Sequence, residues 1–275
     1  MIGVSERRIC KALDFCRAAV RYKPRPRPRD ERLKPIIPLL AWMEPRFGKR
    51  RMRKTVCNLL EHISKGAFER LWQLLKLQVK PRKKRRFRSK ALPVAVLRAL
   101  YQNEVWSMDF MKDWTLKGFP FRIFSVVDER TRRCLALVVA PSFKAQDILD
   151  VLEGLILRHG APINLRSDNG PEFIATTVQR WAEAAGVRLV RSAPASPWEN
   201  PFIESFHSRF RDELSEGEVF GSLVEAQVLC EAYRRWYNES RPHSSLKDMT
   251  PNEFAAGEEK RLPVPPQAGL AGAAA

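Results

Sequence analysis

Three acidic residues stand where carboxylates could act together. Asp109 interrupts the apolar run VWSMDFM, Asp168 ends the run INLRSD, and Glu204 lies in the helical stretch FIESFHSRF. Carboxylates are the oxygen ligands that Mg²⁺ prefers, and two ions roughly 3.5–4 Å apart can stabilise the attacking and leaving oxygens of a phosphodiester. The three acids therefore predict a two-Mg²⁺ site for phosphoryl transfer on nucleic acid, with Mn²⁺ as an alternative. Three acids are few ligands for two ions, so we expect the site to be completed by bound DNA.

Each of these acids also has a simpler interpretation. An unpaired carboxylate among the apolar neighbours of Asp109 would cost several kcal/mol, so a structural ion pair is the alternative there. Asp168 precedes Asn169-Gly170 and would suit a plain turn. Glu204 alone would be read as a solvated helix residue. The 35 residues between Asp168 and Glu204, and the order of the surrounding elements, favour a common site.

Two further acids, Asp113 and Asp128, are rivals for a place in that site. Asp128 ends the apolar run FRIFSVVD directly before a turn that is rich in arginine. We therefore expect Asp128 to form an ion pair with Arg130 or Arg132 and to take no part in chemistry.

Two arginines follow Glu204 in the same predicted helix. This helix begins either at Asn200-Pro201, as N-cap and first helical residue, or at the capping box Ser196–Glu199, and either start puts Glu204 in an early turn. Arg211 lies two turns after Glu204 on the same face, so we expect it to hold a DNA phosphate beside the metals. Arg209 lies off that stripe and is the weaker candidate. A solvated cation is the alternative for both.

Charge is distributed very unevenly along the 275 residues, whose formal net charge is +18. Residues 1–100 hold 29 Lys and Arg against 7 Asp and Glu, a net of +22, whereas residues 101–275 hold 20 against 24, a net of −4. Such asymmetry predicts a polyanionic partner, either nucleic acid or an anionic membrane surface. The absence of a signal peptide, of a long apolar run and of any CxxC pair among five cysteines predicts a cytosolic, non-membrane protein with reduced thiols.

The basic front half is predicted to be helical and to bind DNA. Residues 1–21 form either a short helix-turn-helix or one amphipathic helix, and residues 22–32, where Pro and Arg alternate, form an extended linker. Residues 33–90 form a basic helical module of helix-turn-helix type. We expect DNA contacts from its two basic clusters, Lys49, Arg50, Arg51 and Arg53 in the first and Lys83, Lys84, Arg85 and Arg86 in the second.

The rear half changes to short β-branched strands alternating with amphipathic helices. The expected order is three antiparallel strands, helix, strand, helix, strand and the helix of Glu204: 105–111, 121–128, 134–140, 145–158, 163–168, 171–185, 187–193 and about 200–214. This is the order of an α/β, ribonuclease H-like core with a mixed five-stranded sheet, here over residues 101–216. A C-terminal helix and turn over 217–256 and a disordered tail over 257–275 complete the chain.

Five motifs in this order carry a family resemblance. NEVWSMDFM, FSVVDERTR, LRSDNGPEF, SPWENPFIESFHSRFRDEL and WYNESRPHSSL resemble the orfB-type transposases of the insertion-sequence-three group, members of the DDE superfamily that includes retroviral integrases. The resemblance implies that Asp109, Asp168 and Glu204 form the catalytic, metal-binding triad and that Arg211 is the basic residue following the glutamate. It implies nicking at the element ends by water, followed by attack of the freed 3′-OH on target DNA.

The resemblance also implies partners. These are the terminal inverted repeats, target DNA, further copies of the chain on DNA, and an upstream helix-turn-helix protein of orfA type or a frameshift fusion with it, all in the bacterial cytosol. The sequence departs from the family pattern at Pro201, at His207-Ser208 and at residues 247–249. A DNA-binding regulator with an inactive core, or a ribonuclease acting on RNA–DNA hybrids, remains an alternative.

Overall fold

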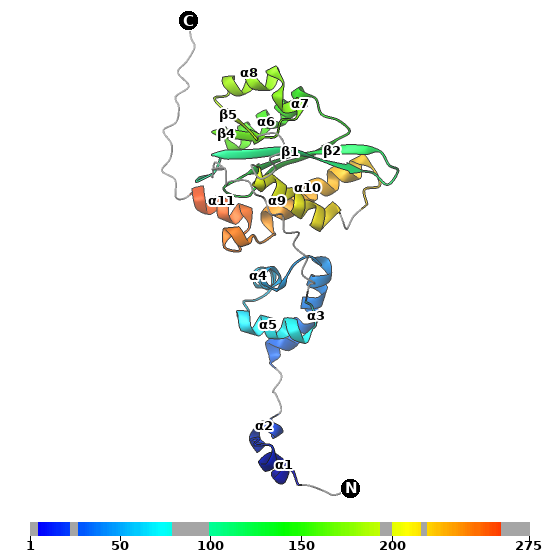
Figure 1. Ribbon diagram of the computed structural model, residues 1–275, viewed down its shortest axis with the longest axis vertical. Helices are drawn as coiled ribbons and strands as arrows, with labels where there is room; N and C mark the ends of the chain where they lie inside the picture. The colour runs from blue at the N-terminus through cyan, green and yellow to red at the C-terminus, as the bar shows by residue number, and fades with distance from the viewer. Residues whose placement is uncertain (1–4, 23–26, 79–98, 193–199, 216–218, 260–275) are drawn as a thin grey trace, which may run out of the picture.

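One mixed five-stranded sheet organises the catalytic half of the protein (Figure 1). The computed structural model describes residues 5–22, 27–78, 99–192, 200–215 and 219–259. The strands are β1 (Val105–Trp114), β2 (Pro120–Asp128), β3 (Cys134–Ala140), β4 (Asn164–Ser167) and β5 (Arg188–Arg191), in the order β3-β2-β1-β4-β5. β1 pairs antiparallel with β2 and parallel with β4, which confirms the predicted ribonuclease H-like topology.

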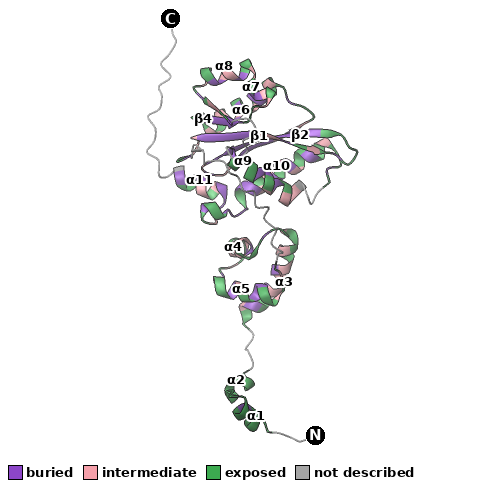
Figure 2. Ribbon diagram, viewed as in Figure 1, coloured by how far each residue is buried: buried purple, intermediate pink, exposed green. Residues whose placement is uncertain are grey.

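Alternation along the long central strands assigns the two faces of the sheet. Trp106 and Met108 of β1 point to one face, and Met111 points to the other. The first face packs on α6 (Ala145–His159), α7 (Pro171–Ile174) and α8 (Thr176–Ala184). The second packs on α9 (Pro201–Phe210) and α10 (Leu223–Glu239). The result is a three-layer α/β unit whose central strands are buried on both sides (Figures 1 and 2).

Asp109 belongs to the face that α9 covers. Its register partner across β1 and β2 is Ser125, a fully buried residue of the same face. The predicted helix over 171–185 is in fact two helices, because the chain is extended at Ala175. α9 begins at Pro201 with Asn200 at the N-cap, so the first of the two predicted starts is the one observed. After Phe210 the helix widens into a π-helical turn, η2 (Arg211–Ser215).

The front half forms a separate helical module with its own core. Its helices are α3 (Pro28–Met43), α4 (Lys49–Leu59) and α5 (Lys65–Leu74), and the core includes Ile37, Met52, Phe68 and Trp72. The predicted linker over 22–32 was wrong at its C-terminal end, because α3 starts at Pro28. Proline suits the first position of a helix, since the N–H that it lacks would have no partner within the helix there. The N-terminal segment is a pair of short helices, α1 (Glu6–Ala12) and α2 (Arg17–Arg21).

The C-terminal segment continues further as helix than the sequence predicted. After the 3₁₀ turn η3 (Ser244–Leu246), the backbone takes positive φ at Lys247 and Asp248, and α11 (Pro251–Glu259) follows. The predicted disordered tail from 257 is therefore wrong for residues 257–259, and residues 260–275 lie outside the described chain. Within the described ranges, no helix combines the length and apolar character needed to cross a membrane.

Asn238 of α10 fastens this helix to the edge strand β3. Its side-chain Oδ1 accepts a hydrogen bond from the Cys134 backbone N–H at 2.9 Å, and its Nδ2 donates to the Cys134 carbonyl at 2.8 Å. Both residues are buried. The amide therefore completes the backbone pairing of β3 where no further strand does.

We expect Asn238→Ala to lower the free energy of unfolding by about 2–4 kcal/mol, because it leaves one buried N–H and one buried C=O without partners. Urea denaturation followed by circular dichroism measures this change. Gln146→Ala, which removes an exposed side chain on α6, is the control and should stay within about 0.5 kcal/mol of wild type. Equal effects of the two substitutions would contradict the assigned role of Asn238.

Candidate active site

Parallel pairing of β1 and β4 brings the first two predicted acids together. The ladder runs Val105 with Asn164 to Ser107 with Arg166. Continuing that register by two residues sets Asp109 beside Asp168, at the point where β4 has ended and β1 continues. The sheet thus explains why an acid in mid-strand and an acid just after a strand become neighbours.

The third acid is delivered by α9. Ile203, Phe206 and Phe210 of this helix are buried against the sheet. Their packing leaves Glu204 on the rim, where it lines an open cavity of about 430 Å³. Asp109, Ser208 and Arg211 line the same cavity, together with Phe110, His207 and Asp212. Asp168 is not among its lining residues, although its charge reaches Asp109.

Asp109 and Glu204, which line this cavity, both have raised pKa values. Burial raises the pKa of Asp109 to about 6, and the negative charges of Asp168 and Glu204 add to the rise. The backbone N–H of Phe110, 2.7 Å from Asp109 Oδ1, and the charge of Arg122 oppose it. Burial also raises the pKa of Glu204. A buried carboxylate with a raised pKa beside other acids is expected in a site that binds a cation.

His207 and Ser125 belong to this site although the sequence did not single them out for chemistry. Ser125 Oγ lies 2.7 Å from His207 Nε2 and 3.0 Å from the Asp109 carbonyl oxygen. His207 Nδ1 lies 3.6 Å from Asp109 Oδ2. Burial and Arg211 lower the pKa of His207 to about 3, so this approach joins a carboxylate to a neutral ring and is not an ion pair. The available signal was position: His207 is one turn after Glu204.

Asp168 sits in the turn that its sequence context suggested. Its Oδ1 accepts a hydrogen bond from the Gly170 N–H at 3.0 Å, and the side chain is exposed. Next to it, Glu172 forms an ion pair with Arg122, whose guanidinium lies 3.8 Å from the centre of the Phe110 ring. The turn and the site are therefore compatible roles for Asp168, because the turn engages Oδ1 while the side chain stays exposed.

The donor chemistry of the three acids fits a divalent metal ion, but their side chains do not form a closed ligand set. Over the residues that the structure describes, no three His, Cys, Asp or Glu side chains are close enough to hold an ion. Residues 193–199, which precede α9, are outside that description. The observed arrangement agrees with a site that substrate has to complete.

The rival acids have other surroundings. Asp128 Oδ1 accepts hydrogen bonds from the Thr131 N–H and hydroxyl, both at 2.7 Å. The expected ion pair of Asp128 with Arg130 or Arg132 is replaced by this turn cap, while Arg130 pairs with Glu258 at 2.9 Å. Asp113 lies further along β1, where its charge acts on Cys230 of α10. Neither acid lines the cavity of Asp109 and Glu204.

The predicted DNA-contacting cations are found in several different environments. Arg211 lines the acidic cavity, whereas Arg209 lines a second cavity on the neighbouring stripe of α9. The four predicted cations of α4 have partners within the protein: Glu69 for Lys49, Asp248 for Arg50, Glu213 for Arg51, and the Ile63 carbonyl for Arg53. The second basic cluster, Lys83, Lys84, Arg85 and Arg86, lies outside the described residues.

The sheet order, with an acid on β1, one after β4 and one on α9, defines an integrase-type ribonuclease H-like core. Two integrase core domain families match the chain, one over residues 100–197 and one over residues 185–251. A 31.7 kDa protein of insertion element IS407 from Burkholderia multivorans is 34% identical over 93% of this chain and 92% of its own length. The chain belongs to the family of insertion-element proteins that carry an integrase core domain.

Two further similarities agree with this assignment. The putative transposase InsD of insertion element IS2E from Escherichia coli is 28% identical over 55% of this chain and 73% of its own length. The intasome of simian T-cell lymphotropic virus, solved by electron cryomicroscopy with a PP2A regulatory subunit, superposes with a TM-score of 0.54 and 15% identity. That match covers 79% of this chain and 78% of the viral chain, and it supports the fold alone.

We expect Asp109→Asn to stabilise the metal-free protein at pH 7.5 by about 2 kcal/mol, because it removes a buried carboxylate that its neighbours repel. The raised pKa means that the folded state binds this proton more tightly than the unfolded chain. Wild type therefore loses stability as the pH rises from about 4 to about 6, and the variant does not.

Urea unfolding in EDTA at pH 4.5 and pH 7.5 measures this difference. The stability gain of Asp109→Asn should be small at the lower pH and nearly complete at the higher one. Asp150→Asn, at an exposed position of α6, is the control. A gain that does not depend on pH, or a loss at pH 7.5, would show that Asp109 is not held among uncompensated charges.

Proposed function

We propose that the protein is an insertion-sequence transposase that cleaves DNA at the ends of its element and joins the freed 3′-OH to target DNA. Asp109, Asp168 and Glu204 are its catalytic acids. The observation that carries the proposal is that Asp109, Glu204 and Arg211 line one open cavity. The charge of Asp168 acts on Asp109, and the chain belongs to a family of insertion-element proteins.

The three carboxylates would hold two Mg²⁺ ions, with Mn²⁺ as an alternative. When bound, such ions stabilise the attacking oxygen and the leaving 3′-oxygen of a phosphodiester. The excess of negative charge in the cavity supports this assignment, because the pKa of Asp109 is already raised in the absence of a cation. Carboxylates as sole donors favour a hard ion over zinc, which prefers nitrogen and sulfur ligands.

The chain's own side chains would orient the DNA in this cavity. Arg211 supplies a guanidinium that can donate two hydrogen bonds to one phosphate, on the same cavity wall as Glu204. His207, neutral and fixed by Ser125, packs against the Asp109 carboxylate and limits its rotation. The openness of the cavity suits a polymer that passes across the surface rather than a small enclosed substrate.

The proposed partners follow from the reaction. The protein would bind the terminal inverted repeats of its element and a target duplex, in the bacterial nucleoid. Joining two element ends requires at least two active sites, so several copies would assemble on DNA. An upstream helix-turn-helix protein of orfA type, separate or fused by frameshifting, would assist recognition of the ends.

A strand-transfer assay tests the function directly. Purified full-length protein, with and without the protein encoded upstream in its element, is incubated with labelled element ends and a supercoiled plasmid. Joined products that require Mg²⁺ or Mn²⁺ are expected. Their absence under every one of these conditions would contradict a transposase and favour a DNA-binding regulator, and cleavage of an RNA–DNA hybrid instead would favour a ribonuclease.

We expect Asp168→Asn to abolish nicking and strand transfer, with at least a thousandfold loss, while binding to element ends is retained. The amide keeps the size of the side chain but is a poor metal ligand. Gel shift and strand-transfer assays on the same preparation separate the two properties. Asp113→Asn removes an acid of β1 outside the cavity and should remain active. An active Asp168→Asn enzyme would exclude this residue from the site.

The second basic cluster should account for a large part of the salt dependence of DNA binding. Replacing Lys83, Lys84, Arg85 and Arg86 with Gln should make the slope of log K against log[salt] shallower by about 3–4, since each lost phosphate contact changes it by about 0.9. Fluorescence anisotropy with a labelled duplex measures the slope. The control is the double variant Lys49→Gln, Arg50→Gln, whose cations are engaged within the protein. Similar slopes for both variants would contradict a DNA-contacting arm.

A further inference from the structure

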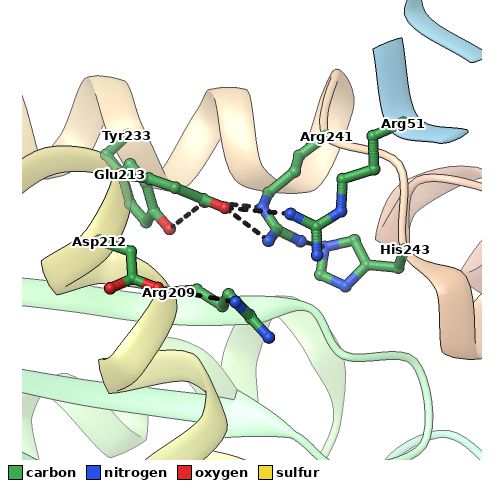
Figure 3. A network of polar contacts seen from close by, with 7 residues as sticks. All are labelled: Arg51, Arg209, Asp212, Glu213, Tyr233, Arg241 and His243. Carbon is green, nitrogen blue, oxygen red and sulfur yellow. Dashed lines mark hydrogen bonds and ion pairs between the residues drawn. The ribbon is translucent and has the colours of Figure 1, made fainter. Parts of the chain in front are cut away.

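A second cavity lies on the stripe of α9 next to the one that carries Glu204. Its volume is about 320 Å³, and four arginines line it: Arg51, Arg132, Arg209 and Arg241. They come from α4, from the turn after β2, from α9 and from the segment after α10. Figure 3 shows Arg51 and Arg241 between Glu213 and His243, with Arg209 below them beside Asp212. The fold therefore collects cations from four separate segments at one place.

The charge at the base of this cavity is not balanced by its acids. Both carboxylate oxygens of Glu213 accept a hydrogen bond from the Arg241 guanidinium, each at 2.7 Å. Oε1 of the same carboxylate lies 3.4 Å from Arg51 Nη1. Arg241 and Glu213 are both almost completely buried. One carboxylate is thus shared by two guanidiniums, which leaves a positive charge in a region of low dielectric.

Nearby titratable groups do not remove this excess. Burial and the charge of Glu213 raise the pKa of Glu44 to about 7, so much of this carboxyl is protonated at neutral pH. The pKa of His243 is far below its ordinary value because of burial and the surrounding charges, first that of Arg241 and then those of Arg51, Arg132 and Arg209. The imidazole is therefore neutral. The charges acting on His243 are those of the same four guanidiniums that line the cavity.

The walls of the cavity suit a tetrahedral anion. The Ser205 side chain on α9 and Ser244 and Ser245 on η3 line it beside the arginines. The Arg132 guanidinium lies 4.0 Å from the centre of the Phe202 ring, which holds it in a fixed orientation at the rim. Arg209 is 44% exposed and meets Asp212 only at 3.6 Å, so it is accessible from solvent.

We propose that this cavity, which we call the arginine pocket (Arg51, Arg132, Arg209 and Arg241), binds one backbone phosphate of the DNA that the active site acts on. The proposal rests on the proposed function in taking DNA as the substrate. The arginine pocket and the acidic cavity are lined by neighbouring stripes of one helix, with Ser205 and Arg209 on one and Glu204 and Ser208 on the other. This arrangement allows phosphates of the same DNA to occupy both. Phosphate contacts of this kind fix the register of DNA without reading its sequence.

The occupant also links the two halves of the protein. Arg51 belongs to the helical module, whereas the other three arginines belong to the catalytic half. A phosphate in the arginine pocket would bind both and would hold the module against the core. The contact of Phe47 with Trp236, at 5.9 Å between ring centres, lies at the same junction.

The test is the salt dependence of DNA binding by the full chain in EDTA. Wild type, Arg132→Gln, Arg209→Gln and their double variant are titrated into a fluorescein-labelled random-sequence duplex at several NaCl concentrations. Arg235→Gln is the matched control, because it removes an exposed arginine of α10 that pairs with Glu231 and does not line the pocket. Arg241 is not substituted, since its loss would leave Glu213 buried and unfold the protein. Circular dichroism verifies that each variant is folded.

One shared phosphate predicts non-additive effects. Each single variant should bind more weakly than the control, and the slope for the double variant should be shallower by about 0.9, the equivalent of one phosphate. A change of about 1.8 would indicate two independent surface contacts and would overturn the pocket, as would a slope equal to that of Arg235→Gln.

Two further arms separate the remaining possibilities. In the first arm, inorganic phosphate is added and thermal stability is measured. If phosphate stabilises wild type but not the double variant, and the slopes for DNA binding are unchanged, the pocket binds a free anion and the DNA proposal is overturned. The slopes are measured without metal and without catalysis. Failure of strand transfer by wild type would therefore contradict the proposed function and leave the pocket result standing, whereas Asp168→Asn should retain the wild-type slope.

Discussion

The packing of α9 on the sheet is the contact on which the whole site depends. Ile203, Phe206 and Phe210 are buried between β1, β2 and α10, and their burial stabilises the contact by roughly 1.5–3 kcal/mol each. Opposing this is the cost of burying the Asp109 carboxylate beside other acids, which raises its pKa to about 6 and amounts to about 3 kcal/mol. Apolar packing is the larger quantity. The fold can therefore hold Glu204 beside Asp109 before any cation is present, and binding energy from a cation or DNA is not needed to bring the helix into place.

The same helix separates two kinds of electrostatic environment. One stripe of α9 presents Glu204 to an acidic cavity, and the next presents Ser205 and Arg209 to a cationic one. The π-helical turn that follows continues this division: Arg211 returns to the acidic cavity, while Glu213 turns inward to Arg241. Had the α-helix continued regularly, the direction of Glu213 would have been set by the helix alone. A widened turn at this point is typical of functional sites, where a helix has to serve two sets of contacts.

The positions of the three candidate acids in the fold could be predicted from the sequence better than the partners of the cations. Strand alternation and the order of elements were enough to place Asp109, the turn after β4 and the helix of Glu204, because these features depend on local periodicity. The partners of Lys49, Arg50 and Arg51 could not be predicted in this way, because Glu69, Asp248 and Glu213 are distant in the chain or on other elements. A run of cations looks the same in sequence whether it faces solvent, DNA or a buried carboxylate. For the same reason the sequence ranked Arg209 as a weak neighbour of the metals, without indicating a cavity of its own.

The departures from the family pattern also acquire a physical meaning. Lys247 and Asp248 have φ of 57° and 63°, a conformation that costs a side chain about 1 kcal/mol and that glycine adopts freely. Asp248 compensates by pairing with Arg50 of α4 at 2.9 Å. His207 likewise fills the space between Ser125 and Asp109. Both departures add contacts, one between the helical module and the catalytic half and one behind the first acid. These contacts fix the surroundings of Asp109 on one side and the junction between the helical module and the catalytic half on the other.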